Sequence, residues 1–173
     1  MKVCVLPALA LLWLAALAGC TSDSPPPVQP SFYVSMANAN AAVDAPTAAS
    51  MISGFRGNNG LGAVEVDPEL MRMAMDQSRA MAAKDKVDRS AGREFNGRLA
   101  AAGFDARLAV ENVGAGYHTL AEAFSGWRDS PSHRANMLKT GVNRLGIAAV
   151  YAPQSKYKVF WTLIMASKDD GRV

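Results

Sequence analysis

The position of the two cysteines is the strongest constraint on how this chain can fold. Cys4 and Cys20 both lie within the first twenty residues, and the rest of the 173-residue sequence contains no cysteine. A domain formed by the later residues has no disulfide bond and must be held together by core packing alone. Half of the residues are apolar, and the length suits one domain with a substantial core rather than two.

The first twenty residues have the pattern of an export signal. Lys2 gives a short basic start, and Val3 to Leu17 form an apolar run that is too short for a stop-transfer helix. The ending Leu17-Ala18-Gly19-Cys20 resembles a bacterial lipobox, in which the cysteine receives a diacylglycerol and becomes the mature N-terminus. The alternative, a buried cysteine at the end of a membrane span, fits the length and the flanking residues less well.

This interpretation makes residues 1–19 a lipoprotein signal peptide and Cys20 the lipidated residue. Acyl chains on Cys20 would attach the protein to a lipid bilayer without a transmembrane helix. Thr21, in place of an aspartate after the cysteine, favours the outer membrane, on its periplasmic or surface side, if the cell has two membranes.

A tether, a globular domain and a short tail are expected after the signal. Residues 20–45 begin with the lipidated cysteine and are rich in proline and alanine, which is typical of a semi-extended spacer. The globular domain is expected over residues 46–168, and residues 169–173 form a polar tail. Loss of Lys2 with the signal lowers the formal charge from +3 to +2. The remaining basic residues are scattered, so no nucleic-acid partner is expected. We also expect the protein to be a monomer.

The most regular helical pattern begins at Asp67. Asp67 is a good N-cap residue, and Pro68 suits the first helical position. One face of this helix carries Leu70, Ala74, Gln77 and Met81. Because Gln77 is the only polar member of the stripe, it is either a buried amide with satisfied hydrogen bonds or part of a cleft wall.

Two shorter helices are expected on either side of this pattern. One starts near Pro46 and ends at Phe55 or Arg56, before the run Gly57-Asn58-Asn59-Gly60. The other covers residues 93–102, and Gly103 is placed to end it.

A single carboxylate stands within an apolar stretch in the second half of the chain. Residues 109–116 are expected to form a short strand or a buried turn, and Glu111 within them needs a partner to stay ionised. Glu111 is therefore either a structural carboxylate bonded by backbone groups or an arginine, or a member of a functional site.

The two histidines have different surroundings. Thr119 starts a helix by a reciprocal capping pattern, and His118 lies in the loop before it, where we expect an exposed side chain without a special role. Ser130 is placed to cap a second helix with its hydroxyl, and Pro131 suits the first turn of that helix. His133 follows in the same turn, where the positive end of the helix dipole favours a neutral imidazole. The alternative for His133 is a purely structural hydrogen bond to nearby backbone.

The end of the chain favours an antiparallel hairpin. Residues 145–151 and 157–166 are strand-like and are separated by Ala152-Pro153-Gln154-Ser155-Lys156. Helices followed by a hairpin sheet indicate an α+β layered fold.

Taken in order, these residues resemble the CAP superfamily, which contains the cysteine-rich secretory, antigen 5 and pathogenesis-related 1 proteins, and within it the bacterial SCP-like domains. The motifs that carry the resemblance are Phe55-Arg56 with Gly60-Leu61, Asp67-Pro68 with Leu70, Ala74 and Met81, Arg98-Leu99 with Gly103-Phe104, Glu111-Asn112, Trp127 with Ser130-Pro131, His133-Arg134, Asn136 and Leu138, and Arg144-Leu145-Gly146-Ile147. The resemblance covers roughly residues 46–166. It implies a three-layer α-β-α sandwich with a central antiparallel sheet and a cleft on one side.

In that family the cleft is lined by two histidines and two acidic residues, and some members bind a divalent metal there. The resemblance places Glu111 and His133 on the matching glutamate and second histidine. Arg89 stands where the first histidine usually lies, and Gln77 replaces a further histidine found in many bacterial members. Ser130, with Asp129 beside it, occupies the position of the second acidic residue.

These departures argue against a metal centre. A stable zinc site needs three or four protein ligands, whereas Glu111 and His133 would supply only two. We therefore expect neither a cofactor nor a bound divalent metal such as zinc. We expect instead that the Arg89 guanidinium pairs with Glu111 and replaces the metal structurally.

Two functions are compatible with this site. The first is a non-catalytic, membrane-anchored binding domain at the cell envelope, whose cleft of Gln77, Arg89, Glu111 and His133 recognises a lipid or a protein. The alternative is a peptidase-like hydrolase, metal-assisted or not, with His133 as general base and Glu111 orienting it. A serine nucleophile fits poorly, because Ser130 acts better as a cap, and Ser132 and His133 point apart as helix neighbours.

Overall fold

The computed structural model of the chain describes residues 29–89, 94–104 and 106–167. The signal peptide 1–19, Cys20 and the tail 169–173 therefore lie outside the described residues, as does the start of the tether. None of the described helices combines the length and the apolar character that crossing a bilayer requires. The elements are, in chain order, η1 (Ser31–Tyr33), α1 (Ala45–Gly57), β1 (Glu65–Val66), α2 (Pro68–Lys84), α3 (Phe95–Ala101), β2 (Ala109–Ala115), α4 (Leu120–Asp129), α5 (Pro131–Met137), β3 (Arg144–Tyr151) and β4 (Val159–Ala166).

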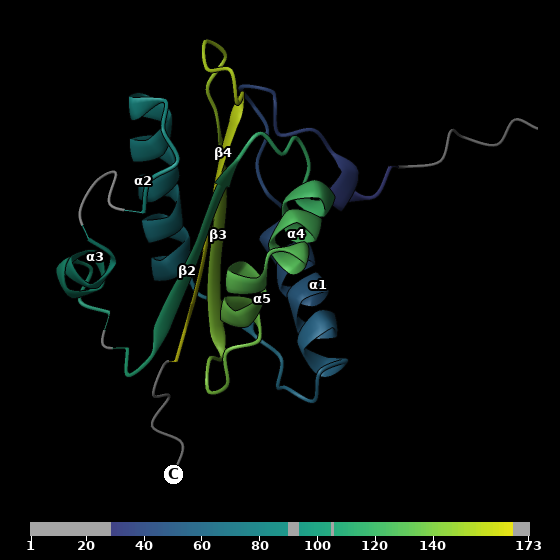
Figure 1. The fold of residues 1–173 in the computed structure, drawn as a ribbon, viewed down its shortest axis with the longest axis vertical. Helices are drawn as coiled ribbons and strands as arrows, with labels where there is room; N and C mark the ends of the chain where they lie inside the picture. The colour runs from purple at the N-terminus through teal and green to yellow at the C-terminus, as the bar shows by residue number, and fades with distance from the viewer. Residues whose placement is uncertain (1–28, 90–93, 105, 168–173) are drawn as a thin grey trace, which may run out of the picture.

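A four-stranded sheet separates two layers of helices (Figure 1). Helices α2 and α3 cover one face, and α1, α4 and α5 cover the other. The strand order is β1-β3-β4-β2, with antiparallel pairing between β2, β4 and β3. This confirms the α+β sandwich, with one difference: β1 pairs parallel to β3, so the sheet is mixed. A strand of two residues is too short to show a period-2 pattern in the sequence.

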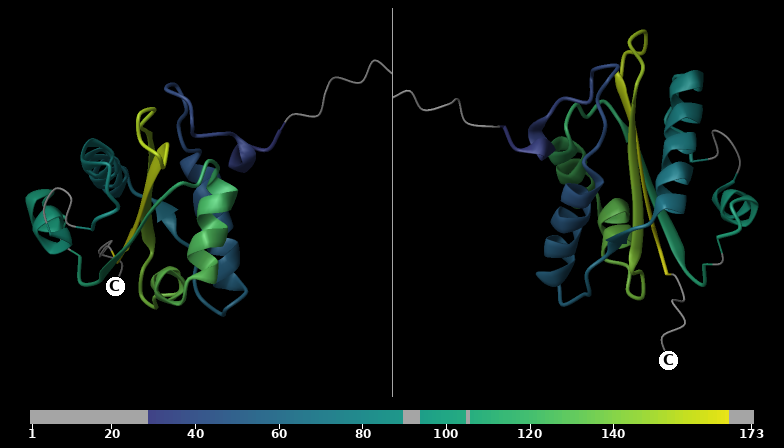
Figure 2. Two further views of the ribbon diagram at one scale, coloured as in Figure 1. Left: turned by 45° about the horizontal axis from the view of Figure 1, so that its top comes forward. Right: turned by 180° about the vertical axis from the view of Figure 1, so that it is seen from behind.

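The predicted hairpin is formed by β3 and β4, and β4 is the centre of the core. Every residue from Val159 to Ala166 is buried. The reason is visible in Figure 2, where helices pack on both faces of the sheet, so neither face of a central strand meets water. Trp161 on β4 meets Trp127 of α4 edge-to-face, with ring centroids 6.4 Å apart.

Helix α2 approaches β3 closely because the strand has a glycine at the contact. A β carbon on Gly146 would lie 2.1 Å from the carbonyl carbon of Leu70. No larger residue fits there without moving the helix or the strand. This contact fixes the distance between α2 and the sheet, and so the depth at which Gln77 lies.

Two of the three predicted N-caps form, and one does not. Asp67 accepts from the N–H groups of Glu69 and Leu70. Asp44, which was not predicted as a cap, accepts from the N–H of Thr47 at the start of α1. Thr119 accepts from the N–H of Glu122 at 3.2 Å, as its capping pattern predicts.

The prediction for Ser130 was wrong in its detail. Ser130 is the N-cap residue of α5, but its hydroxyl makes no capping hydrogen bond. The hydroxyl lies instead 3.5 Å from that of Ser132. Only the carbonyl of Ser130 takes part in the helix, accepting from the N–H of Arg134 at 2.8 Å.

Candidate functional site

Strand β2 lies at one edge of the sheet and carries side chains that face both helical layers. It is the last strand in the order β1-β3-β4-β2, and successive side chains of a strand point to opposite faces. Glu111 points to the face of α3, where it meets Arg98, and Asn112 points to the face of α5. The predicted cleft residues therefore come from both sides of a single edge strand.

Glu111 is bound by Arg98 in a buried ion pair. The Nη2 atom of Arg98 donates to both carboxylate oxygens of Glu111, at 2.8 Å to each. The side chains of Arg98 and Glu111 are only 11% and 2% exposed. Arg98 also lies over the ring of Phe95, with its guanidinium carbon 5.2 Å from the ring centroid. Neither oxygen of Glu111 is left without a donor.

Two kinds of effect shift the pKa of Glu111 in opposite directions. Burial raises the pKa of Glu111 above its ordinary value, while the charge and hydrogen bonds of Arg98, and then the charge of Arg89, work against that rise. The ionised carboxylate thus depends on the guanidinium of Arg98 for the stabilisation that water would otherwise give it.

The expected partner of Glu111 was wrong: Arg98, not Arg89, makes the ion pair. Arg89 is exposed, and within the described residues its guanidinium makes no hydrogen bond or ion pair. Its backbone carbonyl accepts from Nη2 of Arg98 at 3.2 Å. Arg89 therefore lies beside the pair and acts on Glu111 through its charge.

Arg98 was missed as a site residue, although the sequence holds a signal for it. Phe95, Arg98 and Ala102 recur at i, i+3 and i+7, so Arg98 borders the apolar stripe of its helix. A basic residue on the inner side of a short helix is a natural partner for an isolated buried carboxylate.

Two asparagines bind α5 to the edge of β2. Nδ2 of Asn136 donates to the carbonyl oxygen of Glu111 at 3.1 Å and to Oδ1 of Asn112 at 2.9 Å. Nδ2 of Asn112 donates to the carbonyl oxygen of His133 at 3.0 Å. These bonds place His133 next to the strand that carries Glu111, a role the sequence alone did not assign to either asparagine.

His133 is partly buried in the first turn of α5. Burial lowers its pKa below the ordinary value, and the positive charge of Arg89 lowers it further. The neutral imidazole predicted from the sequence is thus favoured, with burial as the larger cause and the charge of Arg89 as the smaller. The positive charge of Arg89 also works to lower the pKa of Glu111. Arg89 therefore affects the titration of both His133 and Glu111.

Gln77 is a buried amide, as one of the two alternatives predicted, but its hydrogen bonds are only partly satisfied. Its side chain is 1% exposed, and its Nε2 atom donates to the carbonyl oxygen of Asp88 at 2.7 Å. Its Oε1 atom is buried without a hydrogen-bond partner. The amide is therefore half satisfied, and it anchors the segment that leads to Arg89.

The neighbours of His133 do not form a catalytic triad. Within the described part of the chain, no hydrogen bond joins Ser130 or Ser132 to the imidazole. Asp129 is exposed and accepts hydrogen bonds from Arg128, which lower the pKa of its carboxyl group. The acidic residue nearest in sequence to His133 is thus paired elsewhere.

The described residues of the site do not form a ligand set for a metal ion. Among residues 29–89, 94–104 and 106–167, no group of three or more histidine, cysteine, aspartate and glutamate side chains could hold one. Of the two ligands the resemblance offers, Glu111 already has both oxygens bonded to a guanidinium. A cation at this position would have to displace Arg98, whose own positive charge would then oppose it.

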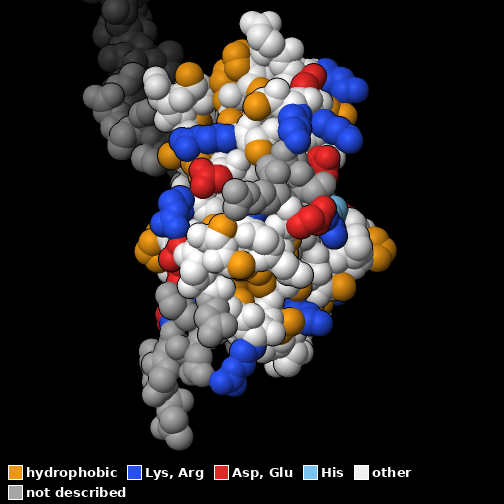
Figure 3. Space-filling view, turned by 90° about the vertical axis from the view of Figure 1, so that its left-hand side faces the viewer, with side chains coloured by type: hydrophobic (Ala, Val, Ile, Leu, Met, Phe, Trp, Pro, Cys, Tyr) orange, Lys and Arg blue, Asp and Glu red, His pale blue; other side chains and the backbone are white. Residues whose placement is uncertain are grey.

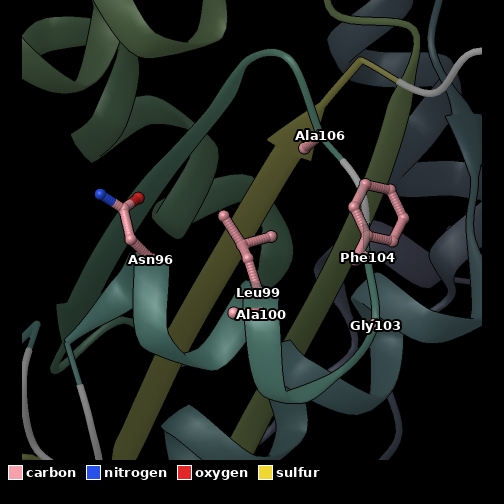
Figure 4. Close-up of a pocket in the computed structure, with 6 residues that line it drawn as sticks. All are labelled: Asn96, Leu99, Ala100, Gly103, Phe104 and Ala106. Atoms are coloured by element: carbon pink, nitrogen blue, oxygen red, sulfur yellow. The ribbon is translucent and has the colours of Figure 1, made fainter.

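Two hollows of the described structure are lined by residues of α3, the helix that carries Arg98. One, of about 470 Å³, is formed by α3 and the segment after it, and Figure 4 shows its lining residues Asn96, Leu99, Ala100, Gly103, Phe104 and Ala106. Another, of about 260 Å³, lies between α2 and α3 and is bordered by Arg98. Neither is lined by Gln77, Arg89, Glu111 or His133. Basic and acidic side chains are interspersed over this side of the molecule, as Figure 3 shows.

A match to a family model identifies the class of protein. Residues 49–165 match the model of the CAP family, described as the cysteine-rich secretory protein family. The match covers more than half of the chain, so this protein belongs to the CAP family, as its motifs indicated. No curated protein matches the sequence.

Solved bacterial structures show the same fold at low sequence identity. An extracellular protein containing an SCP domain from Bacillus anthracis has 22% identity and a TM-score of 0.62, over 71% of this chain and 40% of its own. A cysteine-rich secretory protein from Staphylococcus aureus has 16% identity and a TM-score of 0.59, over 71% and 38%. An outer surface protein from Borrelia burgdorferi has 16% identity and a TM-score of 0.62, over 74% and 98%. The chain thus spans about two fifths of the length of the first two.

Proposed function

We propose that this protein is an exported, lipid-anchored CAP domain whose cleft binds a component of the cell envelope without catalysis. One observation carries the proposal: Arg98 bonds both oxygens of Glu111 in a buried pair. A carboxylate held in this way is not free to orient a general base or to bind a metal. Export is supported by the N-terminal signal pattern and by relatives described as extracellular or outer-surface proteins.

The binding function is tested by recovering the ligand from the cell envelope. A photo-crosslinking group placed in the cleft of the full chain should capture a lipid or a protein, identified by mass spectrometry. His133→Ala should reduce this capture strongly, whereas His118→Ala, an exposed histidine outside the site, should not. Equal capture by the two variants would contradict binding in this cleft.

The absence of a resident metal is tested on the chain beginning at residue 21. This chain contains all described core residues, which lie between Met36 and Ala166. We expect no stoichiometric zinc after purification without chelators. Stoichiometric zinc that is lost in His133→Ala would overturn the proposal.

A hydrolase is the second candidate, supported by a partly exposed His133 whose lowered pKa keeps it ready to accept a proton. Peptide and ester turnover should be compared between the wild type and the Glu111→Gln/His133→Ala double variant. A rate that the double variant abolishes would establish catalysis, and equal residual rates would exclude this site as its source.

Lipid anchoring is tested separately. Labelled palmitate should be incorporated into the wild-type protein in cells and not into Cys20→Ala, and only the wild type should stay with the membrane fraction. Labelling of Cys20→Ala would contradict the lipobox interpretation.

A further inference from the structure

Strand β3 has a neighbouring strand along its whole length on one side only. On that side its register with β4 is continuous from Arg144 to Tyr151. On the other side its pairing with β1 stops at Leu145, which lies opposite Val66. Residues 146–151 therefore form an edge of the sheet, although β3 is an inner strand in the order β1-β3-β4-β2.

The backbone groups at this edge of β3 are available to a partner. The N–H of Ile147 points away from β4 and donates to Sδ of Met71 at 3.2 Å. Because backbone groups alternate in direction along a strand, those of Ala149 and Tyr151 also point outward. Within the described residues, neither makes a hydrogen bond on that side. Open groups of this kind are a template for a further strand.

A hollow of about 390 Å³ lies along the same edge. Residues 149–151 line it, together with Met75 and Arg79 of α2 and with Ala39 and Ala41 of the segment before α1. Met75 packs with the core on the face of α2, and Ala41 packs with the core on the opposite face. The walls thus belong to opposite layers, and Figure 2 shows the segment before α1 passing beside the hairpin end of β3. The hollow is a groove between the layers, at the open edge of the sheet.

The side chains of this groove leave room for a partner and give the groove a positive charge. Ala39, Ala41 and Ala149 have no side-chain atoms beyond the β carbon, so they do not cover the edge. Among the described residues that line the groove, Arg79 alone is charged, and its side chain is 67% exposed. The carboxylate of Asp76 lies 3.9 Å away and is equally exposed, so this ion pair is weak. Arg79 can therefore bond a carboxylate of a bound segment.

We propose that the open edge of β3 binds an extended segment of a partner protein, which adds a strand to the sheet and places an acidic side chain at Arg79. The segment pairs over about five residues, because neighbouring strands rise by nearly the same distance per residue. A single strand fits between the two walls, whereas the sheet of a second copy would bring its own helices against them. The groove is separate from the cleft of Glu111 and His133, so the inference does not depend on the proposed cleft function.

The open edge is tested by amide hydrogen exchange on the chain beginning at residue 21. The N–H groups of Ala149 and Tyr151 should exchange at least about tenfold faster than those of Ala148 and Val150, which face β4. Equal protection of all four would show that the edge is already covered, and would overturn the proposal.

Partner binding is tested by selecting from a phage library of random linear peptides and synthesising an enriched peptide. Ala39→Trp fills the groove from an exposed position without changing β3, and it should weaken binding of this peptide at least about tenfold. Arg79→Glu should also weaken binding. The matched control is Arg72→Glu, an exposed arginine of the same helix that does not line the groove, and it should change the affinity less than about twofold.

Backbone pairing is distinguished from side-chain burial by N-methylation of the peptide. Methyl groups on one alternating set of amides should abolish binding, and those on the intervening set should not, because only every second amide faces β3. Ala149→Pro should weaken binding at least about tenfold, since it removes one outward N–H and proline is tolerated at an exposed strand edge. Equal loss with both methylation patterns would contradict strand addition.

Two further outcomes would overturn the proposal. One is the absence of any enriched peptide, or equal binding by the wild type, Ala39→Trp and Ala149→Pro. The other is a concentration-dependent dimer of the chain without peptide that Ala149→Pro abolishes, which would assign the edge to a second copy. His133→Ala should leave peptide binding unchanged, so failure here and failure of the proposed cleft function are separate results.

Discussion

Two arginines on opposite faces of the sheet, one buried and one partly buried, show how differently the same side chain can be used. Arg56 of α1 is 1% exposed and bonds four carbonyl oxygens, and it makes no ion pair with a described acidic side chain. Its acceptors are the carbonyls of Gly62, Met137, Lys139 and Val142. Arg98 instead meets a carboxylate on the face of α2 and α3. Arg56 ties loops and a helix end together, whereas Arg98 neutralises the one acidic residue expected in the cleft.

The difference follows from the kind of acceptor that each guanidinium bonds. Carbonyls at the end of a helix have no partner within it, and Arg56 supplies donors to Met137 and to the residues after it. Burial lowers the pKa of Arg56 without changing its charge state near neutral pH. Arg98 stabilises a charge rather than a set of neutral dipoles. Loss of either arginine should therefore lower the free energy of unfolding, and for Arg98 this loss should depend on pH.

The largest effect is expected for Arg56→Met. This change leaves four carbonyl groups without their donor, and buried unsatisfied groups cost about 1–3 kcal/mol each, so the free energy of unfolding should fall by at least ~3 kcal/mol. Urea unfolding measures this loss. Arg56→Lys keeps the charge without the fork and should recover only part of the loss. A loss below ~1 kcal/mol for Arg56→Met would contradict the structural role of these bonds.

The next effect is expected for Arg98→Met, which leaves Glu111 buried without its partner. Breaking one side of a buried ion pair costs about 3–5 kcal/mol near neutral pH. The loss should shrink as the pH falls, because the pKa of Glu111 is raised by burial once Arg98 is gone, and the folded variant then takes up a proton before the unfolded chain does.

A double-mutant cycle completes this test. Arg98→Met/Glu111→Leu removes both charges, and its stability should lie close to that of the wild type. Urea unfolding of both single variants and the double variant gives the coupling energy. Additive losses would show that the two side chains do not stabilise each other.

A smaller effect, on titration, is expected at His133. Arg89→Gln removes a positive charge that lowers the pKa of the imidazole, so this pKa should rise in the variant. NMR titration of the ring protons measures the shift, and Arg79→Gln should leave it unchanged. The sign for stability follows: a lowered pKa gives a contribution that is present above about pH 6.5. That contribution is lost as the pH falls toward the folded value, and Arg89→Gln should weaken this dependence.

The smallest effect is expected for Gln77→Met. The substitution removes the hydrogen bond to Asp88 and at the same time removes the buried, unpaired Oε1 atom. These changes oppose each other, so the free energy of unfolding should change by less than ~1 kcal/mol. A loss above ~2 kcal/mol would mean that Oε1 has a partner, such as a buried water molecule.

The sequence predicted those parts of the fold that depend on neighbouring residues. The helix that starts at Asp67 and the hairpin of β3 and β4 follow from capping, periodicity and turn composition. The two-residue strand β1 could not be found in this way, since it forms only because β3 lies beside it. The cap at Ser130 failed for a different, local reason, because its hydroxyl lies beside that of Ser132 and not beside a backbone N–H of the helix.

The site was predictable in outline but not in its pairing. The sequence required a partner for Glu111, and Arg89 was chosen by its family position. The helical spacing that places Arg98 at the inner side of its helix indicates a buried basic residue, but it does not show that Glu111 is the residue it meets. The choice depends on how α3 lies over β2, which is a matter of tertiary packing. The asparagine bonds between α5 and β2 have the same origin, because they join residues 21 to 25 positions apart.

The contact of Asn136 with the carbonyl of Glu111 also has a consequence for association between molecules. β2 is an edge strand, and free backbone groups on such a strand can pair with a second chain and start aggregation. Asn136 occupies one of these groups, and α5 lies alongside the strand. This part of the β2 edge is therefore less open to pairing with a second copy of the chain than an uncovered edge would be.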